Sequence, residues 1–201
     1  MEIYSLEYKN IYYIFAMENK LNRMKKIIAF AGSNSKKSIN KQLVTYASEL
    51  AENVEVEVEV LDLNDFDVPL FSVDLESEMG HPENAKRLVD KIKQVDGVMV
   101  SLAEHNGAYA AVFKNIFDWM SRIEQKTFQD KPMLLMATSP GGRGGASVIA
   151  IAKDRFPRHN ANIVAEFSLP MFNTNFSEGK IIDKELNNEL INRVEQFKNA
   201  L

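Results

Sequence analysis

Short apolar segments alternate regularly with segments of helical periodicity along this chain. The sequence predicts strands at residues 26–31, 54–61, 97–102, 132–138 and 162–167, and helices at residues 40–52, 82–95, 108–122, 146–155 and 183–198. This alternation produces a parallel sheet with helices on both faces, because each crossover connection is right-handed. We therefore predict a three-layer, doubly wound α/β domain with a five-stranded parallel sheet.

The segment at residues 54–61 places one strand at an edge of the sheet. Valine and glutamate alternate strictly from Val54 to Val60. A period of two leaves one face of a strand in water. We expect the glutamates to form a solvated face, which also discourages edge-to-edge association.

Composition excludes several classes of protein. The chain has 201 residues, of which 45% are apolar and 26% are charged, as expected for one domain with a sizeable core. A net charge of −4 argues against a nucleic-acid partner. Cysteine is absent, which removes disulfides and thiolate metal sites and fits a cytoplasmic protein. No apolar run approaches the roughly 18–20 residues that span a membrane.

The segment at residues 1–23 differs from the rest of the chain. It is rich in tyrosine and ends just before Met24, which directly precedes the first predicted strand. We expect residues 24–201 to form the domain and Met24 to be the natural start, with residues 1–23 as a dispensable extension. The alternative is a helix that packs on the domain or on a second subunit.

The loop after the first predicted strand has the composition of a phosphate site. Gly32 is followed by Ser33, Ser35, Ser38 and Asn40, and a helical pattern begins at the end of the loop. Backbone N–H groups and hydroxyls at a helix N-terminus favour an anion. The loop lacks the glycine pattern of a P-loop or of a dinucleotide fingerprint. The alternative is that Ser38 or Asn40 only caps the helix.

The loop after the third predicted strand contains Glu104, His105, Asn106 and Gly107. These residues could present backbone and amide groups to a planar ring such as a flavin, which needs donors near N5 and O4 and acceptors near N3. The alternative is a turn with positive φ at Asn-Gly.

The loop after the fourth predicted strand runs from Ser139 through Gly141 to Gly145 and is rich in glycine. Glycine at a strand end allows close approach of the backbone to a flat ligand. Arg143 could pair there with a phosphate of a nicotinamide nucleotide. A flexible surface loop is the alternative. In the strand order 2-1-3-4-5, the three loops follow the strands whose carboxyl ends bind ligands.

These three loops resemble the signatures of the NAD(P)H-dependent FMN reductase family of flavodoxin-like proteins. The resemblance covers about residues 25–164. It rests on Gly32, Ser33, Ser35, Ser38 and Asn40, on residues 103–108 with 113–119, and on Ser139, Gly141, Gly144 and Gly145. Two departures stand out, because Ala103 replaces a proline and His105 replaces a tyrosine that lies beside the flavin. We expect them to bear on substrate preference and redox tuning more than on FMN binding itself.

The resemblance implies an FMN-dependent oxidoreductase that takes a hydride from NAD(P)H and reduces a quinone or similar small-molecule acceptor. The chemistry would take place on the flavin, without a catalytic acid or base from the protein and without a metal. Ser33, Ser35, Ser38 and Asn40 would anchor the phosphate and ribityl chain; the ring would be framed by Glu104, His105, Asn106, Gly107, Ser139 and Gly141.

Family members commonly form homodimers or homotetramers, so we expect at least a dimer with the helix around Trp119 in the contact. Two other functions stay open at this point: a flavodoxin-like electron carrier and a flavin-free scaffold.

Overall fold

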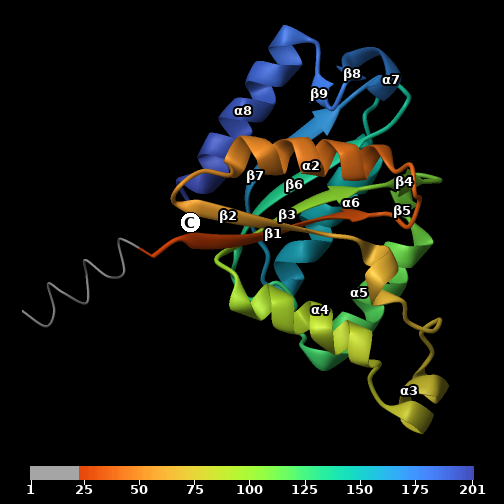
Figure 1. Ribbon diagram of the computed structural model, residues 1–201. Helices are drawn as coiled ribbons and strands as arrows, with labels where there is room; N and C mark the ends of the chain where they lie inside the picture. The colour runs from red at the N-terminus through yellow and green to blue at the C-terminus, as the bar shows by residue number, and fades with distance from the viewer. Residues whose placement is uncertain (1–22) are drawn as a thin grey trace, which may run out of the picture.

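The computed structural model describes residues 23–201 as a parallel sheet between two helical layers (Figure 1). The five strands lie in the order β2-β1-β3-β6-β7, and all neighbouring pairs are parallel. Their bounds are β1 Lys25–Gly32, β2 Val56–Leu61, β3 Gly97–Leu102, β6 Pro132–Thr138 and β7 Asn162–Leu169. The predicted flavodoxin-like fold and strand order are therefore confirmed. The expectation for residues 1–23 falls, apart from Arg23, outside the described residues.

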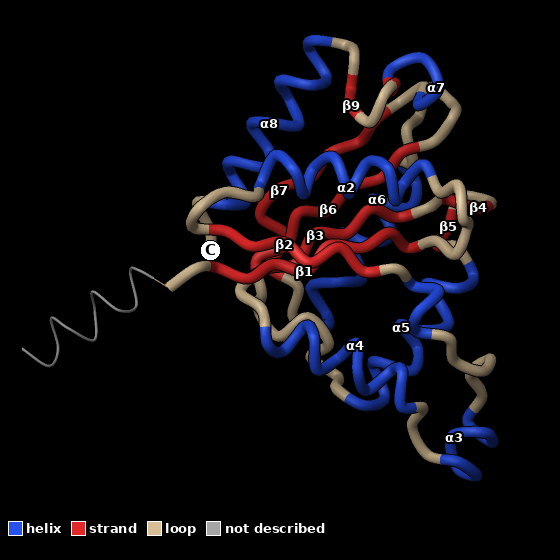
Figure 2. Tube along the Cα trace, in the orientation of Figure 1, coloured by secondary structure: helices blue, strands red, loops and turns tan. Residues whose placement is uncertain are grey.

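Helices cover both faces of the sheet (Figures 1 and 2). One face packs against α2 (Ile39–Ala51) and α8 (Lys184–Lys198). The other packs against α4 (Glu83–Gln94), α5 (Ala111–Ile123) and α6 (Ala146–Arg155). Successive side chains of a strand point to opposite faces, so β1 supplies both cores.

The central strands are buried on both sides. Every residue of β3 is buried, as is β6 after its first residue. This explains their continuous apolar runs, which are typical of strands covered by helices on both faces.

Strand β2 lies at the edge of the sheet, as its alternating pattern predicts. It begins two residues later than predicted, because Asn53 Oδ1 accepts a hydrogen bond from Glu55 N at 2.8 Å and closes a turn. Val54 is consequently 90% exposed.

Residues 62–81 lie between a predicted strand and a predicted helix and were assigned neither, but they contain two short helices, η1 (Leu63–Phe66) and α3 (Val73–Met79). Ser72 caps α3 by accepting a hydrogen bond from Leu75 N at 3.0 Å. None of the α3 residues is buried, so the helix has no apolar period that a sequence pattern could reveal.

The segment around α3 is held on α5. Trp119 Nε1 donates to the Pro69 carbonyl at 2.8 Å, and Arg122 Nε donates to both oxygens of Glu76 at 3.0 Å. Trp119 is 0% exposed. It therefore belongs to the core of the chain and cannot itself lie in a subunit contact.

Small elements complete the second half of the chain. The 3-10 helix η2 (Phe156–His159) follows α6, and α7 (Phe172–Asn175) with the hairpin β8 (Phe176–Ser177) and β9 (Lys180–Ile181) lies between β7 and α8. Within residues 23–201, no helix has the length and apolar character needed to cross a membrane.

Candidate functional site

The carboxyl ends of β1, β3 and β6 lie side by side at one edge of the sheet, because these strands are neighbours and parallel. The three loops singled out from the sequence follow these ends and come together there. We call residues 32–40 the phosphate loop and residues 139–145 the glycine loop. Between them in sequence lies the hairpin of β4 (Glu104–His105) and β5 (Ala108–Tyr109).

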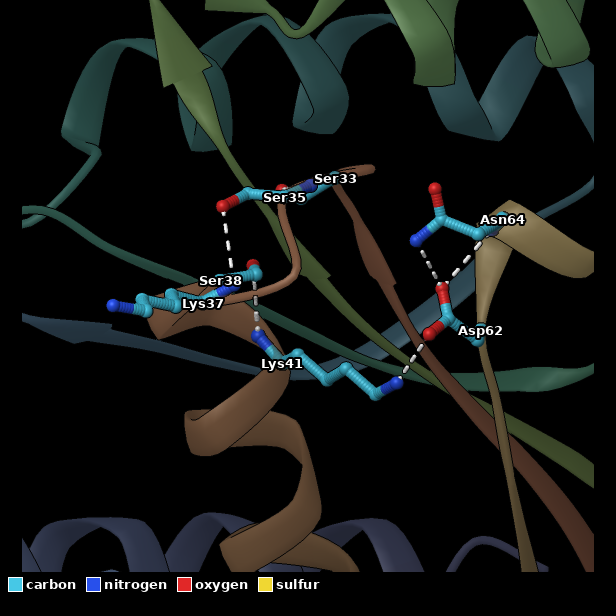
Figure 3. Close-up of polar contacts among 7 residues, drawn as sticks. All are labelled: Ser33, Ser35, Lys37, Ser38, Lys41, Asp62 and Asn64. Atoms are coloured by element: carbon cyan, nitrogen blue, oxygen red, sulfur yellow. Dashed lines mark hydrogen bonds and ion pairs between the residues drawn. The ribbon is translucent and has the colours of Figure 1, made fainter.

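Serine hydroxyls shape the phosphate loop. Ser33 Oγ accepts from Ser35 N at 3.2 Å, Ser35 Oγ from Lys37 N at 3.3 Å, and Ser38 Oγ from Lys41 N at 3.1 Å (Figure 3). None of the three hydroxyls donates a hydrogen bond to another residue in the described part of the chain. The loop therefore presents three free O–H donors at the N-terminus of α2, where the helix dipole favours an anion.

The lysines near this loop fall into two groups. Lys41 reaches across to Asp62, after β2, and Figure 3 shows the two side chains end to end. Its hydrogen bond holds the pKa of Asp62 below its usual value, with help from the backbone N–H of Asn64. Lys36 and Lys37 are exposed and form no ion pair with a described residue, so they add positive potential at the mouth of the loop.

Gly32 is required by packing rather than by an unusual backbone conformation. A Cβ at this position would lie 2.9 Å from Leu102 Cδ2 and 3.2 Å from Phe113 Cγ. The residue therefore lets the end of β1 lie close to β3 and α5, and its φ is not in the left-handed region.

Asn40, predicted to be a phosphate ligand, is 3% exposed and hydrogen bonded within the chain. Its Oδ1 accepts from Ser101 Oγ at 2.8 Å and from Thr138 N at 2.9 Å, and its Nδ2 donates to the Thr138 carbonyl at 3.1 Å. Ser101 is the second-to-last residue of β3, and Thr138 is the last residue of β6. Asn40 thus joins the start of α2 to two neighbouring strand ends.

The β4–β5 hairpin is closed by Asn106 and Gly107, whose φ angles are 53° and 75°. Two successive positive φ angles define a type I′ turn, for which Asn-Gly is the preferred pair. The turn alternative is thus correct for the backbone, whereas a contact with a planar ring remains a prediction. His105 is exposed on this hairpin.

Glu104 links the hairpin to α6. Its Oε2 accepts from Val148 N at 3.0 Å. The N-cap of α6 is Gly145, which has no side chain to offer. Glu104 supplies a negative charge in its place, where the helix dipole favours one.

The glycines of the glycine loop serve two purposes. Gly144 and Gly145 have φ angles of 56° and 85°. A Cβ on Gly144 would collide with Ser168 Oγ, and one on Gly145 would lie 2.6 Å from Ala137 Cβ. These two glycines are therefore explained by packing within the chain. A Cβ on Gly142 would meet nothing within 4 Å, so this part of the loop has room for the predicted close approach of a ligand.

The glycine loop is anchored to the segment after β7. Phe172 N donates to the Ser139 carbonyl at 3.1 Å and Met171 N to the Gly141 carbonyl at 3.0 Å. Arg143 is exposed, donates to Ser147 Oγ at 3.2 Å, and has no acidic partner among residues 23–201. The loop is thus fixed at its start, while its arginine is available to an anion.

The donor set fits FMN. A phosphate needs hydroxyl and N–H donors at a helix N-terminus, and the phosphate loop provides them. A flat ring needs backbone donors and acceptors close to its edge, and the hairpin and Gly141–Gly142 could supply them. A cavity of about 490 Å³ opens beside Asn34 of the phosphate loop, between the segment after β2 and the first two turns of α5, and its lining includes no residue of the hairpin or the glycine loop. Sequence reasoning missed Ser101 and Thr138, because each is one polar residue inside an apolar strand.

Most of the chain is similar to a known protein family. The profile of the family described as "NADPH-dependent FMN reductase" matches residues 25–195. The quinone reductase of Escherichia coli (strain K12) is 32% identical over 120 residues, which are 60% of this chain and 63% of that protein. The NADPH:quinone oxidoreductase of Arabidopsis thaliana is 31% identical over 124 residues, which are 61% of this chain and 62% of that protein. The matched stretch thus spans less than two thirds of these relatives.

A solved structure extends the likeness over most of the chain. It is FerB, a flavoenzyme NAD(P)H:(acceptor) oxidoreductase from Paracoccus denitrificans, with a TM-score of 0.71 and 27% identity over 88% of this chain and 96% of that one. The family match covers well over half of the present sequence, including all three loops. The chain therefore belongs to the NADPH-dependent FMN reductase family.

Proposed function

We propose that this protein is an FMN-dependent NAD(P)H oxidoreductase that reduces a quinone or a similar small-molecule acceptor. The observation that carries the proposal is the meeting of the phosphate loop, the β4–β5 hairpin and the glycine loop at one sheet edge. Bound FMN would supply the redox chemistry, taking a hydride from NAD(P)H and passing reducing equivalents to the acceptor.

The protein's part is to bind and orient. Ser33, Ser35 and Ser38 anchor the phosphate and ribityl chain through their free hydroxyl hydrogens. Asn40 was predicted in the same group, but its amide is engaged with β3 and β6. Lys36 and Lys37 attract the anion without forming a fixed ion pair.

The ring end would be framed by the hairpin and the glycine loop. The predicted residues are Glu104, His105, Asn106, Gly107, Ser139 and Gly141. Glu104 acts mainly by holding the hairpin against α6. None of these residues would be required as an acid or base, because bound FMN would supply the hydride chemistry.

A quinone as acceptor is supported by the activities of the relatives. A further one, from Burkholderia sp., is a 2-hydroxy-1,4-benzoquinone reductase and is 33% identical over 122 residues. His105 and Ala103, the two departures from the family pattern, lie on or beside the hairpin, where they would act on acceptor preference.

A homodimer or homotetramer is part of this proposal. A cavity of about 650 Å³ lies between α5 and α6 and is lined by Tyr109, Phe117, Ile151 and His159 among others. The Tyr109 hydroxyl is buried without a partner among the described residues. This cavity is larger than the one beside the phosphate loop. We assign it to a subunit contact and not to the flavin site, because it is lined mainly by α5, α6 and η2 and by no residue of the phosphate loop or the glycine loop. A light-scattering mass near one chain of 22.8 kDa would contradict it.

A cytoplasmic location is also proposed. The absence of cysteine from the whole sequence fits a reducing compartment. Cell fractionation with an antibody against the protein tests this.

The test of function is a visible spectrum of the purified protein with FMN, followed by anaerobic NADH or NADPH. Flavin bands that bleach, and recover on addition of a quinone, are the expected result. Bound flavin that does not bleach would favour an electron carrier, and no bound flavin would favour a flavin-free scaffold.

Serine variants test whether the phosphate loop binds the phosphate of FMN. Ser33→Ala combined with Ser35→Ala removes two hydroxyl donors, and we expect FMN affinity to fall by about 100-fold. Ser72→Ala is the matched control, because it removes a hydroxyl from the distant cap of α3. Equal FMN affinity in the double variant and the wild type would contradict the assignment.

A further inference from the structure

A line of buried hydrogen bonds runs beneath the site loops. It connects Ser101 near the end of β3, Asn40 in the first turn of α2, Thr138 at the end of β6 and the Leu169 carbonyl at the end of β7. Ser101, Asn40 and Thr138 are 0%, 3% and 1% exposed. Buried polar groups are costly unless they are paired, and here each polar side-chain atom has at least one partner.

The placement of these groups is specific. Ser101 is the only polar residue of β3, and Thr138 is the only polar residue of β6. Both residues form hydrogen bonds with the side chain of Asn40. Asn40 Oδ1 accepts two hydrogen bonds and Nδ2 donates one, so the amide leaves its oxygen no further capacity.

Capping does not explain Asn40. Ser38 is already the N-cap of α2 and accepts from Lys41 N. Asn40 lies beyond the cap, and its hydrogen bonds leave the helix for strands that are 61 and 98 residues further along the sequence.

The line of hydrogen bonds joins the two ends of the candidate site. Asn40 is the last residue of the phosphate loop, and Thr138 directly precedes Ser139, the first residue of the glycine loop. Through Leu169 the line continues to the segment that anchors the glycine loop at Ser139 and Gly141. A ligand with a phosphate at one loop and a ring at the other needs the separation of these loops to be fixed.

We propose that Asn40 is a positioning residue that sets the separation between the phosphate loop and the glycine loop, and that its contribution to FMN binding does not pass through the phosphate. This rests on the proposed function. It differs from the role of a phosphate ligand, which the sequence alone had indicated for Asn40.

The test compares FMN with riboflavin, which carries the same ring without the phosphate. Dissociation constants for both are measured by flavin fluorescence, together with the thermal midpoint of each flavin-free variant. Asn40→Ala should weaken both flavins by a similar factor, about tenfold, because the loop that meets the ring also shifts. Ser101→Ala removes one bond of the line and should weaken both by about threefold.

Two controls separate positioning from other effects. Ser33→Ala should weaken FMN by a much larger factor than riboflavin, which keeps the ribityl chain but lacks the phosphate. Ser48→Ala removes another buried hydroxyl of α2, one that bonds only to the Val44 carbonyl of the same helix at 2.7 Å. It should lower the thermal midpoint without changing either dissociation constant.

Each other outcome counts against the proposal. If Asn40→Ala weakens FMN alone, Asn40 acts at the phosphate. If it lowers only the thermal midpoint, as Ser48→Ala does, its role is limited to folding. If Asn40→Ala does not fold, Ser101→Ala decides by the same two dissociation constants. A wild-type protein that binds neither flavin would refute the proposed function and this inference with it.

Discussion

Glu104 should contribute measurably to stability even without any cofactor. Its carboxylate accepts from Val148 N at 3.0 Å and is the only side chain that satisfies the first turn of α6 in the described structure, because Gly145 is the N-cap. Glu104→Ala removes this acceptor and leaves the N–H to whatever water can reach it.

The size of the effect follows from two contributions. A hydrogen bond to a charged group contributes about 1.5–3 kcal/mol, and a charge at a helix terminus about 0.3–1 kcal/mol. Glu104 is only half-buried, so we take the lower half of the combined range. Glu104→Ala should therefore lower the free energy of unfolding by about 2 kcal/mol, or the thermal midpoint by about 6 °C for a domain of this size. Glu104→Gln keeps an acceptor without the charge and should cost about half as much.

The assay is equilibrium unfolding in guanidinium chloride on flavin-free protein, so that any contact between Glu104 and the ring does not contribute. Glu78→Ala is the matched control, because Glu78 is exposed on α3 and forms no hydrogen bond or ion pair with a described residue. A loss of less than about 0.5 kcal/mol for Glu104→Ala would refute the capping role. Equal losses for Glu104→Ala and Glu78→Ala would do the same.

Four further predictions concern other parts of the chain. Gly145→Ala places a methyl group against β6 at a φ of 85° and should cost about 2–3 kcal/mol in guanidinium unfolding, whereas Gly142→Ala should cost less than about 0.5 kcal/mol, and equal costs would contradict the packing argument. Burial raises the pKa of Tyr109 to about 12, so its stabilising effect is present below pH 10 and is lost as the pH rises toward 12; an absorbance titration that loses its late-ionising tyrosine in Tyr109→Phe checks this. The hydrogen bond from Arg122 lowers the pKa of Glu76. The link between α3 and α5 should therefore hold above the usual glutamate pKa of 4.5 and weaken as the pH falls below it; hydrogen exchange of α3 that is independent of pH, after correction for intrinsic rates, would count against this. A chain that starts at Met24 should keep the thermal midpoint and FMN affinity of the full chain, and a clear loss of either would favour a packed N-terminal helix.

The sheet could be predicted from the sequence because its signals are local. Each central strand is a short apolar run followed by a helical pattern, and the right-handed crossover then leaves few topologies. α3 was not predicted, because it has no local apolar pattern. It buries no side chain, and contacts with α5 such as Trp119 to Pro69 hold its segment in place.

The contacts that join the loops of the candidate site could not be predicted from the sequence. The rule that ligands bind at the carboxyl ends of strands singled out three loops, and the structure places all three at the same end of the sheet. The bonds that join them were not visible, because Asn40 and Ser101 are 61 residues apart, and Glu104 and Val148 are 44 apart. Gly144 and Gly145 were attributed to ligand approach, although contacts with Ser168 and Ala137 in their own chain account for them. A glycine shows that space is short, but the sequence does not show which atoms occupy it.

The β4–β5 hairpin places exposed residues at the candidate site that contribute little to the stability of the fold. Its Asn-Gly turn is a locally favoured structure, and it is attached through Glu104, through a backbone bond from Ala110 N to the Ala103 carbonyl and through the ring of Tyr109, which packs on Phe113 and Phe156. The side chains of His105 and Ala108 are exposed and make no contribution to either core. Substitutions at these two positions carry almost no stability penalty. If the hairpin borders the acceptor as proposed, single substitutions at His105 or Ala108 could change acceptor preference without disturbing the sheet.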